Sequence, residues 1–233
     1  MKRFLILVFL LVQLNAQEIY ATFDVVAKKD ASLAFIASGI VDKVFVEVGD
    51  AVKEGEILAV LQNDDIKASL EMAKITLKYA KKSYERQKKV RHLIDEAKFD
   101  QVAKRYEEAK VAYKLKTVLY KQTFLKAPFD GIIYAKHIEV GDAVSKMRLP
   151  TVLKIQSSSE RKLLIHFDQK YIKSVHIGDV FRYKTDSQNS YHNAKIAKIY
   201  PVSDTKNRKI TAEVYLKNLT PGLFGDGYII TKE

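Results

Sequence analysis

Cysteine is absent from this chain of 233 residues, and its absence excludes several kinds of chemistry. There can be no disulfide framework, no metal centre held by thiolates and no thiol nucleophile. No two histidines stand at the spacing at which a helix presents paired ligands, and the methionines form no soft-metal cluster. The residues concerned are His92, His137, His166, His176, His192, Met1, Met72 and Met147. We therefore expect no metal centre.

Patterns that carry catalysis are missing as well. Asp64 and Asp65 are neighbouring carboxylates, but they stand where a long helix is expected to begin. Carboxylates at such a place cap the backbone and interact favourably with the helix dipole. The three serines of 157–159 have no adjacent base to activate them and are typical of a linker. With no nucleic-acid recognition motif either, we expect neither an enzyme nor a nucleic-acid-binding protein.

No apolar run in the chain approaches the roughly 20 residues that a membrane-spanning helix needs. The run from Phe4 to Val12 follows a basic start, residues 1–3, and precedes residues 13–16, which end on a small residue. These are the three regions of a secretory signal. We expect cleavage after Ala16 and a periplasmic protein. Leu14 is larger than the residue usual at its position, so an uncleaved anchor is the alternative.

Glycine and proline are missing from Ile66 to Leu125, a stretch rich in residues that favour helices. Two helices are expected here, each of about 28 residues and roughly 42 Å long. In both, less polar residues alternate three and four apart, which is the narrow seam of a coiled coil. The seam residues are Leu70, Ala73, Leu77, Ala80 and Tyr84 in the first helix and Phe99, Val102, Tyr106, Ala109 and Tyr113 in the second.

If the chain folds back near Leu93, the two seams face one another in an antiparallel hairpin. A small residue then faces a large one in three of four layers, as close packing requires. The layers are Ala73 with Tyr113, Leu77 with Ala109, Ala80 with Tyr106, and Tyr84 with Val102. Asp95 can cap the second helix, and Glu96 is favourable in its first turn.

The expected hairpin carries most of the net charge. Residues 66–126 contain 17 Lys and Arg against 7 Asp and Glu, so they hold +10 of the formal +12. Taken singly, each lysine is an ordinary solvated side chain. Together they favour an acidic partner or anionic headgroups.

An internal repeat flanks the hairpin. Residues 39–61 recur 92 positions later as residues 131–153, with ten of 23 aligned positions identical, including one run of Glu-Val-Gly-Asp-Ala-Val. In each copy apolar residues alternate up to the Gly-Asp pair, and a second apolar stretch follows. This predicts a strand, a tight turn and a strand. Because a unit of about 25 residues cannot bury its own core, the copies should pack together as one body.

The last third of the chain, after Ile155, alternates apolar and polar residues in short stretches separated by turn signals. Regular spacing of this kind predicts a small antiparallel β-barrel. Its expected strands are Lys162 to Phe167, Val180 to Lys184, Ala194 to Tyr200, Ile210 to Leu216 and Tyr228 to Thr231. Residues of about 19–32 are expected to add one more strand.

The repeat resembles the lipoyl or biotinyl carrier domain, a flattened β-sandwich of two quasi-symmetric halves. The matching residues are 49–58 (GDAVKEGEIL) and 127–133 (APFDGII). In that family a lysine on the turn between the halves is exposed for cofactor attachment. Asp65 takes its place here, and Lys67, two positions on, would not lie at the same apex. A carboxylate cannot form the required amide, so no cofactor is expected.

A carrier-like body split by a coiled coil, behind a signal peptide, resembles the periplasmic adaptor (membrane fusion) subunits of tripartite efflux pumps, close to the resistance-nodulation-division type. Residues 177–180, 196–201 and 204–208 also resemble the barrel of that family. The resemblance implies a homo-oligomeric protein of transmembrane transport and multidrug resistance, without enzymatic activity. Its barrel would contact an inner-membrane transporter, and its hairpin tip an outer-membrane channel.

The family's hairpin tip engages the channel through an arginine, a leucine four residues later and a hydroxyl residue seven further on. Arg86 matches the arginine, Val90 takes the leucine position, and Asp95 stands where the hydroxyl would cap the helix. The resemblance therefore implies a docking tip made of Arg86, Val90, Arg91, Leu93 and Asp95. An ion pair between Arg86 and a helix neighbour is the alternative role for that residue.

The expected class is α+β, a split lipoyl-like β-sandwich with an inserted antiparallel coiled-coil hairpin and a small β-barrel. The expected parts are a signal peptide at 1–16, a barrel at 17–32 and 156–233, a lipoyl-like domain at 33–64 and 126–155, and a hairpin at 65–125. Because the chain stops at Glu233, soon after the last expected strand, contact with the pump is expected to fall to the barrel. An adaptor of a type I secretion or ATP-driven export system and an unmodified lipoyl-type carrier domain are the alternatives.

Overall fold

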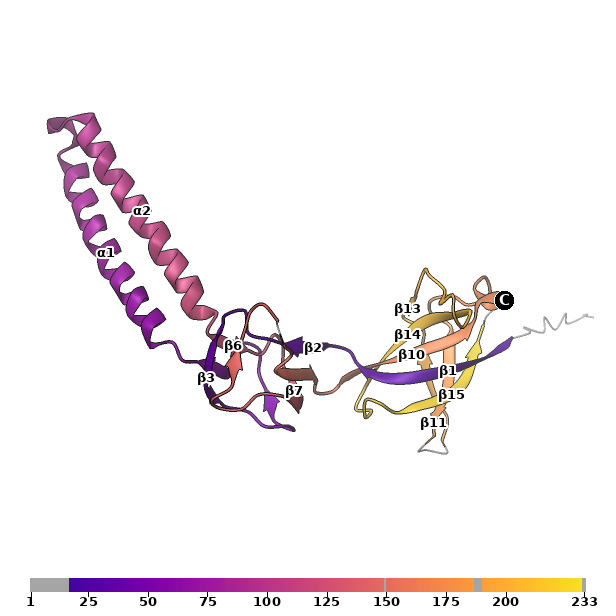
Figure 1. Ribbon diagram of the computed structural model, residues 1–233. Coiled ribbons are helices and arrows are strands. Elements are labelled where there is room, and N and C mark those ends of the chain that lie inside the picture. The colour runs from indigo at the N-terminus through magenta and orange to yellow at the C-terminus, as the bar shows by residue number, and fades with distance from the viewer. Residues whose placement is uncertain (1–16, 149, 187–189, 232–233) are drawn as a thin grey trace, which may run out of the picture. The chain divides into compact units, whose positions relative to one another are not determined.

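The computed structural model describes residues 17–148, 150–186 and 190–231 (Figure 1). The expected signal peptide, residues 1–16, lies outside the described residues. The chain divides into two compact units. Asp30–Ser158 is here named the central unit, and the described residues of Met1–Lys29 and Ser159–Glu233 form the terminal unit.

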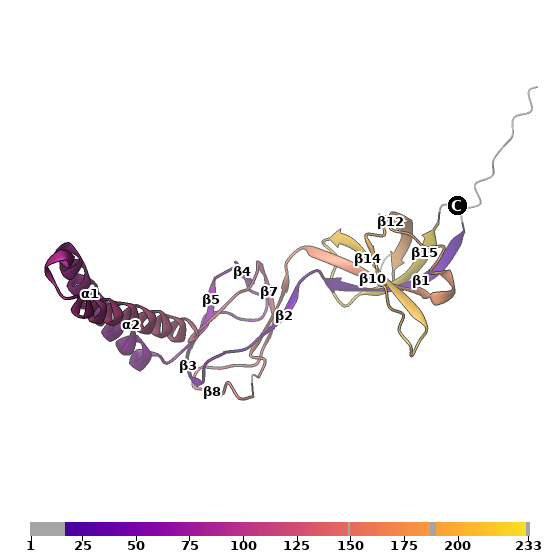
Figure 2. The same cartoon turned by 90° about the horizontal axis from the view of Figure 1, so that it is seen from above.

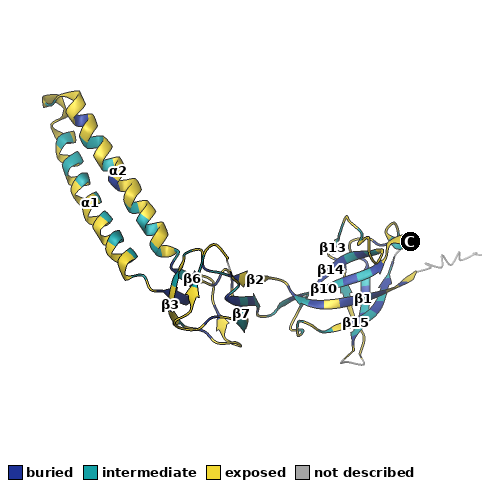
Figure 3. Ribbon diagram, viewed as in Figure 1, coloured by how far each residue is buried: buried dark blue, intermediate teal, exposed yellow. Residues whose placement is uncertain are grey.

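The central unit combines two helices with two four-stranded sheets of orders β2-β9-β7-β4 and β6-β5-β3-β8. Both sheets contribute to one hydrophobic core, and buried residues are dark blue in Figure 3. Leu58, Ile133, Leu153 and Ile155 are fully buried in this core. The elements are β2 (Asp30–Leu33), β3 (Gly39–Val44), β4 (Ala51–Val52), β5 (Ile57–Leu61), α1 (Asp64–Lys89), the 3-10 turn η1 (Arg91–Leu93), α2 (Glu96–Lys121), β6 (Phe124–Lys126), β7 (Gly131–Lys136), β8 (Ala143–Val144) and β9 (Leu153–Ser157).

The two copies of the repeat exchange their short strands. Strands β3 and β4 of the first copy correspond to β7 and β8 of the second, 92 residues later. β4 pairs with β7, which places Ala51 opposite Ile132. β8 pairs with β3, which places Ala143 opposite Ile40. The two pairings are identical under the 92-residue shift, so each sheet contains a strand supplied by the other copy.

The Gly-Asp pair forms the same turn in both copies. Gly49 and Gly141 have φ of 102° and 96°, a region that favours glycine because it has no Cβ. The Gly49 amide donates to the Ile133 carbonyl (2.8 Å) and the Gly141 amide to the Val41 carbonyl (2.9 Å). The following aspartate closes the turn: Oδ2 of Asp50 accepts from the amide three residues earlier at 2.7 Å, and its counterpart in the second copy does so at 2.8 Å. Each turn therefore forms a hydrogen bond that holds its copy of the repeat against the other copy.

The terminal unit contains one seven-stranded antiparallel sheet of order β12-β11-β15-β1-β10-β14-β13. Its strands alternate between buried and exposed residues, and Phe23, Leu163, Ile165, Phe181 and Ile229 face its core. The elements are β1 (Glu18–Ala27), β10 (Glu160–Asp168), the 3-10 turn η2 (Gln169–Tyr171), β11 (Val180–Thr185), β12 (His192–Lys195), β13 (Lys198–Ile199), β14 (Lys209–Lys217) and β15 (Phe224–Ile230).

One short segment joins the two edges of this sheet. The sequence predicts a single strand from Ala194 to Tyr200, whereas the structure has two, β12 on β11 and β13 on β14. The chain bends between them at Ile196, whose amide bonds the Asp179 carbonyl, while the next amide bonds the Glu213 carbonyl. Because β12 and β13 are opposite edges of the sheet, this bend brings the curled sheet back on itself.

The Gly-Asp turn occurs a third time, in the terminal unit. Gly178 has φ of 99° and donates to the Ile196 carbonyl at 2.8 Å, and Asp179 accepts from the His176 amide at 2.7 Å. The residue three before the glycine is buried in all three turns, and the residue just before it is exposed. The buried residues are Val46, Ile138 and Val175, and the exposed ones are Val48, Val140 and Ile177.

Helices α1 and α2 run antiparallel and side by side in both views (Figures 1 and 2). All ten expected seam positions are buried or half-buried, and Phe99 and Ala109 are the most buried of them. The centre of the Tyr84 ring lies 5.7 Å from that of Phe99 and 5.1 Å from that of Tyr106. These two residues come before and after the expected partner Val102 along α2. These contacts place Tyr84 at the height of Val102 along α2.

The boundary between the units falls three residues earlier than expected at the N-terminal crossing. Residues 30–32 were expected in the barrel, but they form most of β2, which pairs with β9 in the central unit. The physical reason is burial, because Ala31 and Leu33 pack on the core of the central unit. The return crossing correspondingly falls after Ser158 and not after residue 155.

Glu213 is a buried carboxylate on β14 of the terminal unit. It accepts hydrogen bonds from Tyr200 (2.6 Å), Lys162 (2.9 Å) and Tyr215 (2.9 Å). Burial alone would raise the pKa of Glu213, but the three hydrogen bonds outweigh it and hold the pKa at about 2. Since Tyr200 follows β13, the carboxylate ties this edge to β14.

The shared turn predicts a matched pair of destabilising substitutions. Gly49→Ala and Gly141→Ala should each lower the free energy of unfolding by about 1–3 kcal/mol, because alanine is strained at this φ. The space around both glycines is open, so the cost is one of backbone strain alone. Urea unfolding followed by circular dichroism measures it, with Val48→Ala in the same turn as a control expected within about 0.5 kcal/mol of the parent. Equal stability of Gly141→Ala and the parent would contradict this account.

Glu213 predicts acid sensitivity of the terminal unit. Its pKa is lower in the folded chain than the ordinary 4.5, so its stabilisation is complete above about pH 4.5 and is lost as pH falls towards 2. The difference corresponds to about 3 kcal/mol. Glu213→Gln should therefore lower stability at pH 7 and flatten the change between pH 4.5 and 2, measured by urea unfolding. The exposed Glu18→Gln is the control, and an unchanged slope in Glu213→Gln would refute the prediction.

Candidate functional site

The expected docking residues lie where α1 turns into α2. Arg86 is in the last turn of α1, and Val90 ends that helix, its amide bonding the Gln87 carbonyl at 3.2 Å. Leu93, in η1, is 73% exposed, the most exposed apolar side chain of the tip. The structure therefore brings these residues together at one end of the hairpin, with apolar side chains open to solvent.

Arg91 has an internal contact that helical spacing could not reveal. Its guanidinium lies 4.7 Å from the centre of the Phe99 ring, which also contacts Tyr84. A guanidinium over an aromatic face is attracted by the ring quadrupole. Phe99 is buried although it lies one turn from the tip. Arg91 thus helps to cover the last layer of the seam, and its position in η1, outside the helical period, hid this contact from the sequence.

Asp95 caps α2 as expected. Its Oδ1 accepts a hydrogen bond from the Ala97 amide at 2.9 Å, and its carbonyl accepts from the Phe99 amide at 3.1 Å. Glu96 follows in the first turn, where a carboxylate favours the helix dipole. Asp95 is nevertheless an exposed residue.

A shallow groove of about 650 Å³ lies beside Arg86 on α1. Tyr79 is 62% exposed there. The ammonium groups of Lys78 and Lys82 lie 6.0 and 5.8 Å from the centre of its ring. Among the described residues, no ion pair includes Arg86. An exposed aromatic ring among cations suits an acidic partner. Sequence reasoning missed this groove because it followed only the seam.

Asp65 lies in the first turn of α1 and not at the apex of a turn between two strands. The helix begins at Asp64, and the residue at the N-cap position is Asn63, which makes no capping hydrogen bond with its side chain. The expected cap by Asp64 and Asp65 is therefore wrong in this detail, although both carboxylates do lie near the positive end of the helix dipole. The Asn63 side chain instead bonds the Thr123 hydroxyl at 2.9 Å, across the base of the hairpin.

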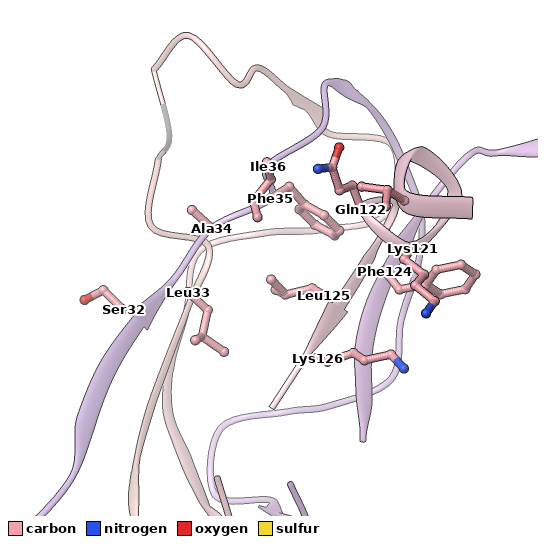
Figure 4. A pocket seen from close by; sticks show the side chains of 11 residues that line it. Ser32, Leu33, Ala34, Phe35, Ile36, Lys121, Gln122, Phe124, Leu125 and Lys126 are labelled. Carbon is pink, nitrogen blue, oxygen red and sulfur yellow. The ribbon is translucent and has the colours of Figure 1, made fainter. Parts of the chain in front are cut away.

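A depression of about 430 Å³ lies at the base of the hairpin, where the end of α2 meets the segment after β2 (Figure 4). Leu33, Phe35 and Leu125 form its apolar floor, and all three are core residues. Lys121 and Lys126 line it as exposed side chains. None of its lining polar side chains, all within the described residues, is buried. It therefore offers little to orient a specific small molecule.

The described residues offer neither a cluster suited to bind a metal ion nor a helix suited to span a membrane. In the ranges 17–148, 150–186 and 190–231, no three side chains of His, Asp or Glu gather in a way that could hold a metal ion. Over those ranges, none of the helices combines the length and the apolar character needed to cross a membrane. The hairpin tip and the groove beside Arg86 remain the surfaces with distinctive chemistry.

The cap at Asp95 predicts a local effect at the tip. Asp95→Ala should cost about 1 kcal/mol of local stability, because the Ala97 amide loses its partner. Asp95→Asn is the matched control, since asparagine also caps helices well. Hydrogen exchange of the Ala97 and Phe99 amides measures the change, and faster exchange is expected in Asp95→Ala only. Equal exchange in the two variants would show that the cap does not hold the tip.

A family model and several curated proteins match this chain. The family model described as a CzcB-like, barrel-sandwich hybrid domain matches residues 29–153. The cobalt-zinc-cadmium resistance protein CzcB of Cupriavidus metallidurans is 28% identical over 209 residues, covering 80% of this chain and 40% of that protein. The cation efflux system protein CzcB of an Alcaligenes species is 27% identical with the same coverage. The chain thus spans about 40% of the length of these curated relatives.

Solved structures share the fold at low identity. A MacA–MexA chimera that contains the Pseudomonas aeruginosa MexA α-hairpin domain has a TM-score of 0.85 at 19% identity, over 94% of this chain and 83% of the other. The membrane fusion protein Spr0693 of Streptococcus pneumoniae has a TM-score of 0.74 at 14% identity, over 92% of this chain and all of the other. The family model covers more than half of the chain, and it confirms the resemblance drawn from the sequence. The chain belongs to the family of proteins with a CzcB-like barrel-sandwich hybrid domain.

Proposed function

We propose that this chain is a periplasmic adaptor subunit of a tripartite efflux pump, which links an inner-membrane transporter to an outer-membrane channel. The match to the CzcB-like domain over residues 29–153 carries the proposal. Relatives named for cation efflux and for cobalt, zinc and cadmium resistance support an export role. The adaptor itself is not an enzyme, and the work is done by the transporter.

The architecture supports this role by its division of surfaces. The central unit splits into a sheet body and a helical hairpin, whose entry and exit lie together at Leu61 and Thr123. The hairpin holds most of the net charge and exposes Val90 and Leu93 at its tip. We assign contact with the channel to this tip and contact with the transporter to the curled sheet of the terminal unit. Residues 1–16 serve in this proposal as the signal peptide for export.

The cargo follows from the relatives and not from a site in this chain. Both CzcB relatives are named for metal cations, so we propose that the pump exports divalent cations. If the pump exported several drugs and not metal cations, the proposed cargo would be wrong. Deleting the gene should lower resistance to cobalt, zinc or cadmium salts, and restoring the full chain should recover it. Loss of drug resistance with unchanged metal resistance would contradict the cation cargo while leaving the adaptor role intact.

Partner identity is the sharpest test of the adaptor role. A photoreactive amino acid at Leu93, exposed at the tip, should crosslink in cells to an outer-membrane channel, identified by mass spectrometry. The same probe at Lys67, near the base of α1, is the matched control and should not reach the channel. Recovery of no outer-membrane channel from the Leu93 probe would overturn the proposal.

Arg86 gives the corresponding mutational prediction. Arg86→Glu should reduce the Leu93 crosslink and the resistance conferred by the pump at least several-fold, because the net charge of the side chains that line the groove then falls from +3 to +1. The exposed position of Arg86 means that folding should be unaffected. Lys67→Glu makes the same charge change near the hairpin base and should behave like the parent. Unchanged resistance in Arg86→Glu would count against its role in docking.

A further inference from the structure

Two depressions at the base of the hairpin adjoin one another. The first, of about 430 Å³, is the one drawn in Figure 4. The second, of about 410 Å³, is lined by the lower turns of both helices and by residues 36–38. Because Ile36 and Gln122 line both depressions, the two form one groove that passes these side chains. We name it the base groove.

One wall of the base groove continues β2 beyond the point where its pairing ends. Pairing between β2 and β9 stops at Leu33. The burial pattern still alternates after it as in a strand, with Phe35 buried and Ala34 and Ile36 more open. The backbone of residues 34–37 makes no hydrogen bond to other backbone groups of the described chain. A segment with the burial of a strand and an unpaired backbone can accept a further strand.

The opposite wall in Figure 4 is β6, together with the end of α2. β6 is the outermost strand of one sheet of the central unit, as β2 is of the other. The base groove therefore runs between two sheet edges. Its lining side chains offer little to a small molecule, but an extended chain can pair with the backbone of such an edge.

Apolar side chains and lysines line the base groove together. Ile36, Val118 and Leu119 are 64%, 43% and 38% exposed. Of the described residues that line the groove, one is acidic, Asp65, and four are lysines: Lys116, Lys121, Lys126 and Lys146. Within the described ranges, none of these lysines is part of an ion pair. The surface thus complements a chain that brings both apolar side chains and carboxylates.

This chain has no free segment of that composition. The residues outside the described ranges are 1–16, 149, 187–189 and 232–233, and Glu233 is the one acidic residue among them. A second copy offers no more, because it has the same sequence. The occupant of the base groove is therefore sought in another protein.

We propose that the base groove binds an extended segment of another protein in which apolar and acidic residues alternate. The backbone of that segment pairs with residues 34–37 and adds a strand there. Because successive side chains of a strand point to opposite faces, one row can cover Ile36, Val118 and Leu119 while the acidic row is left for the lysines. The base groove is separate from the hairpin tip, so it gives the chain a contact that the proposed function does not use.

Peptide binding to the purified full-length protein tests this chemistry. A fluorescein-labelled octapeptide of alternating valine and glutamate should bind, as measured by fluorescence anisotropy. The valine–lysine counterpart should bind at least several-fold more weakly, because it meets the lysines with like charge. The valine–glutamate peptide with all its amides N-methylated cannot donate to a neighbouring strand and should also bind at least several-fold more weakly. Absence of binding by the first peptide, or equal binding by either control peptide, would overturn the proposal.

Hydrogen exchange shows whether a strand is added. With the valine–glutamate peptide bound, amides within residues 34–37 should exchange at least several-fold more slowly, because they gain partners. The Ala97 amide, bonded by Asp95 at the far end of the hairpin, is the internal control and should not change. Binding of the peptide without protection at residues 34–37 would refute the added strand.

Substitutions with matched controls locate the site. Ile36→Glu and Lys121→Glu should each weaken binding of the valine–glutamate peptide at least several-fold. Ile75→Glu and Lys81→Glu make the same changes on α1, outside the base groove, and should bind it like the parent. All four residues are exposed, so folding should be unaffected. Equal binding by Ile36→Glu and Ile75→Glu would place the peptide elsewhere and overturn the proposal.

The natural occupant is tested in cells. A photoreactive amino acid at Ile36 should crosslink to a protein other than this chain, and mass spectrometry of the crosslinked segment should show alternating apolar and acidic residues. A crosslink to an identical copy, a crosslink to a segment without acidic residues, or no crosslink would each count against the proposal. The adaptor role is judged separately, by the channel crosslink from Leu93, so either result can fail without the other.

Discussion

The exchange of short strands between the two repeat copies is the constraint on which the rest of the central unit depends. β4 and β8 each pair with the other copy, so neither copy completes a sheet alone. The chain between the copies must therefore leave the body and return to the same place. Leu61 and Thr123, at the two ends of this insertion, are joined by a backbone hydrogen bond of 2.9 Å. An antiparallel pair of equal helices, each of 26 residues, satisfies that requirement directly.

The Gly-Asp turn holds the exchanged strands of the two repeat copies in place. Its glycine amide reaches a carbonyl of a distant strand, and its aspartate holds the amide three residues back. The same device at Gly178 connects β11 to the bend at Ile196, where the curled sheet of the terminal unit comes back on itself. One local solution therefore stabilises long-range closure in both units. Each of the three turns leaves one apolar side chain exposed, and these side chains are Val48, Val140 and Ile177.

Features determined by local chemistry could be predicted from the sequence. The repeat carries identical residues through the turn, the helices lack glycine and proline, and Asp95 stands at a typical cap position. Features that depend on tertiary geometry could not. Arg91 reaches Phe99 only because η1 departs from the helical period. The third turn shares just Gly-Asp with the repeat, too little to be recognised as a copy, and the bend at Ile196 has no proline or glycine to mark it.

The residues at the end of the hairpin do not contribute equally to the proposed channel contact. Arg86 lies on α1 with Lys82, one turn before the tip, in the groove assigned to the proposed channel contact. Val90 and Leu93 lie beyond the last turn of α1, at the end of the hairpin. Only the tip contact can use them, and apolar side chains at the end of a basic hairpin gain most from being buried against a partner. In the proposed channel contact, specific recognition therefore rests more on these two apolar residues than on Arg86.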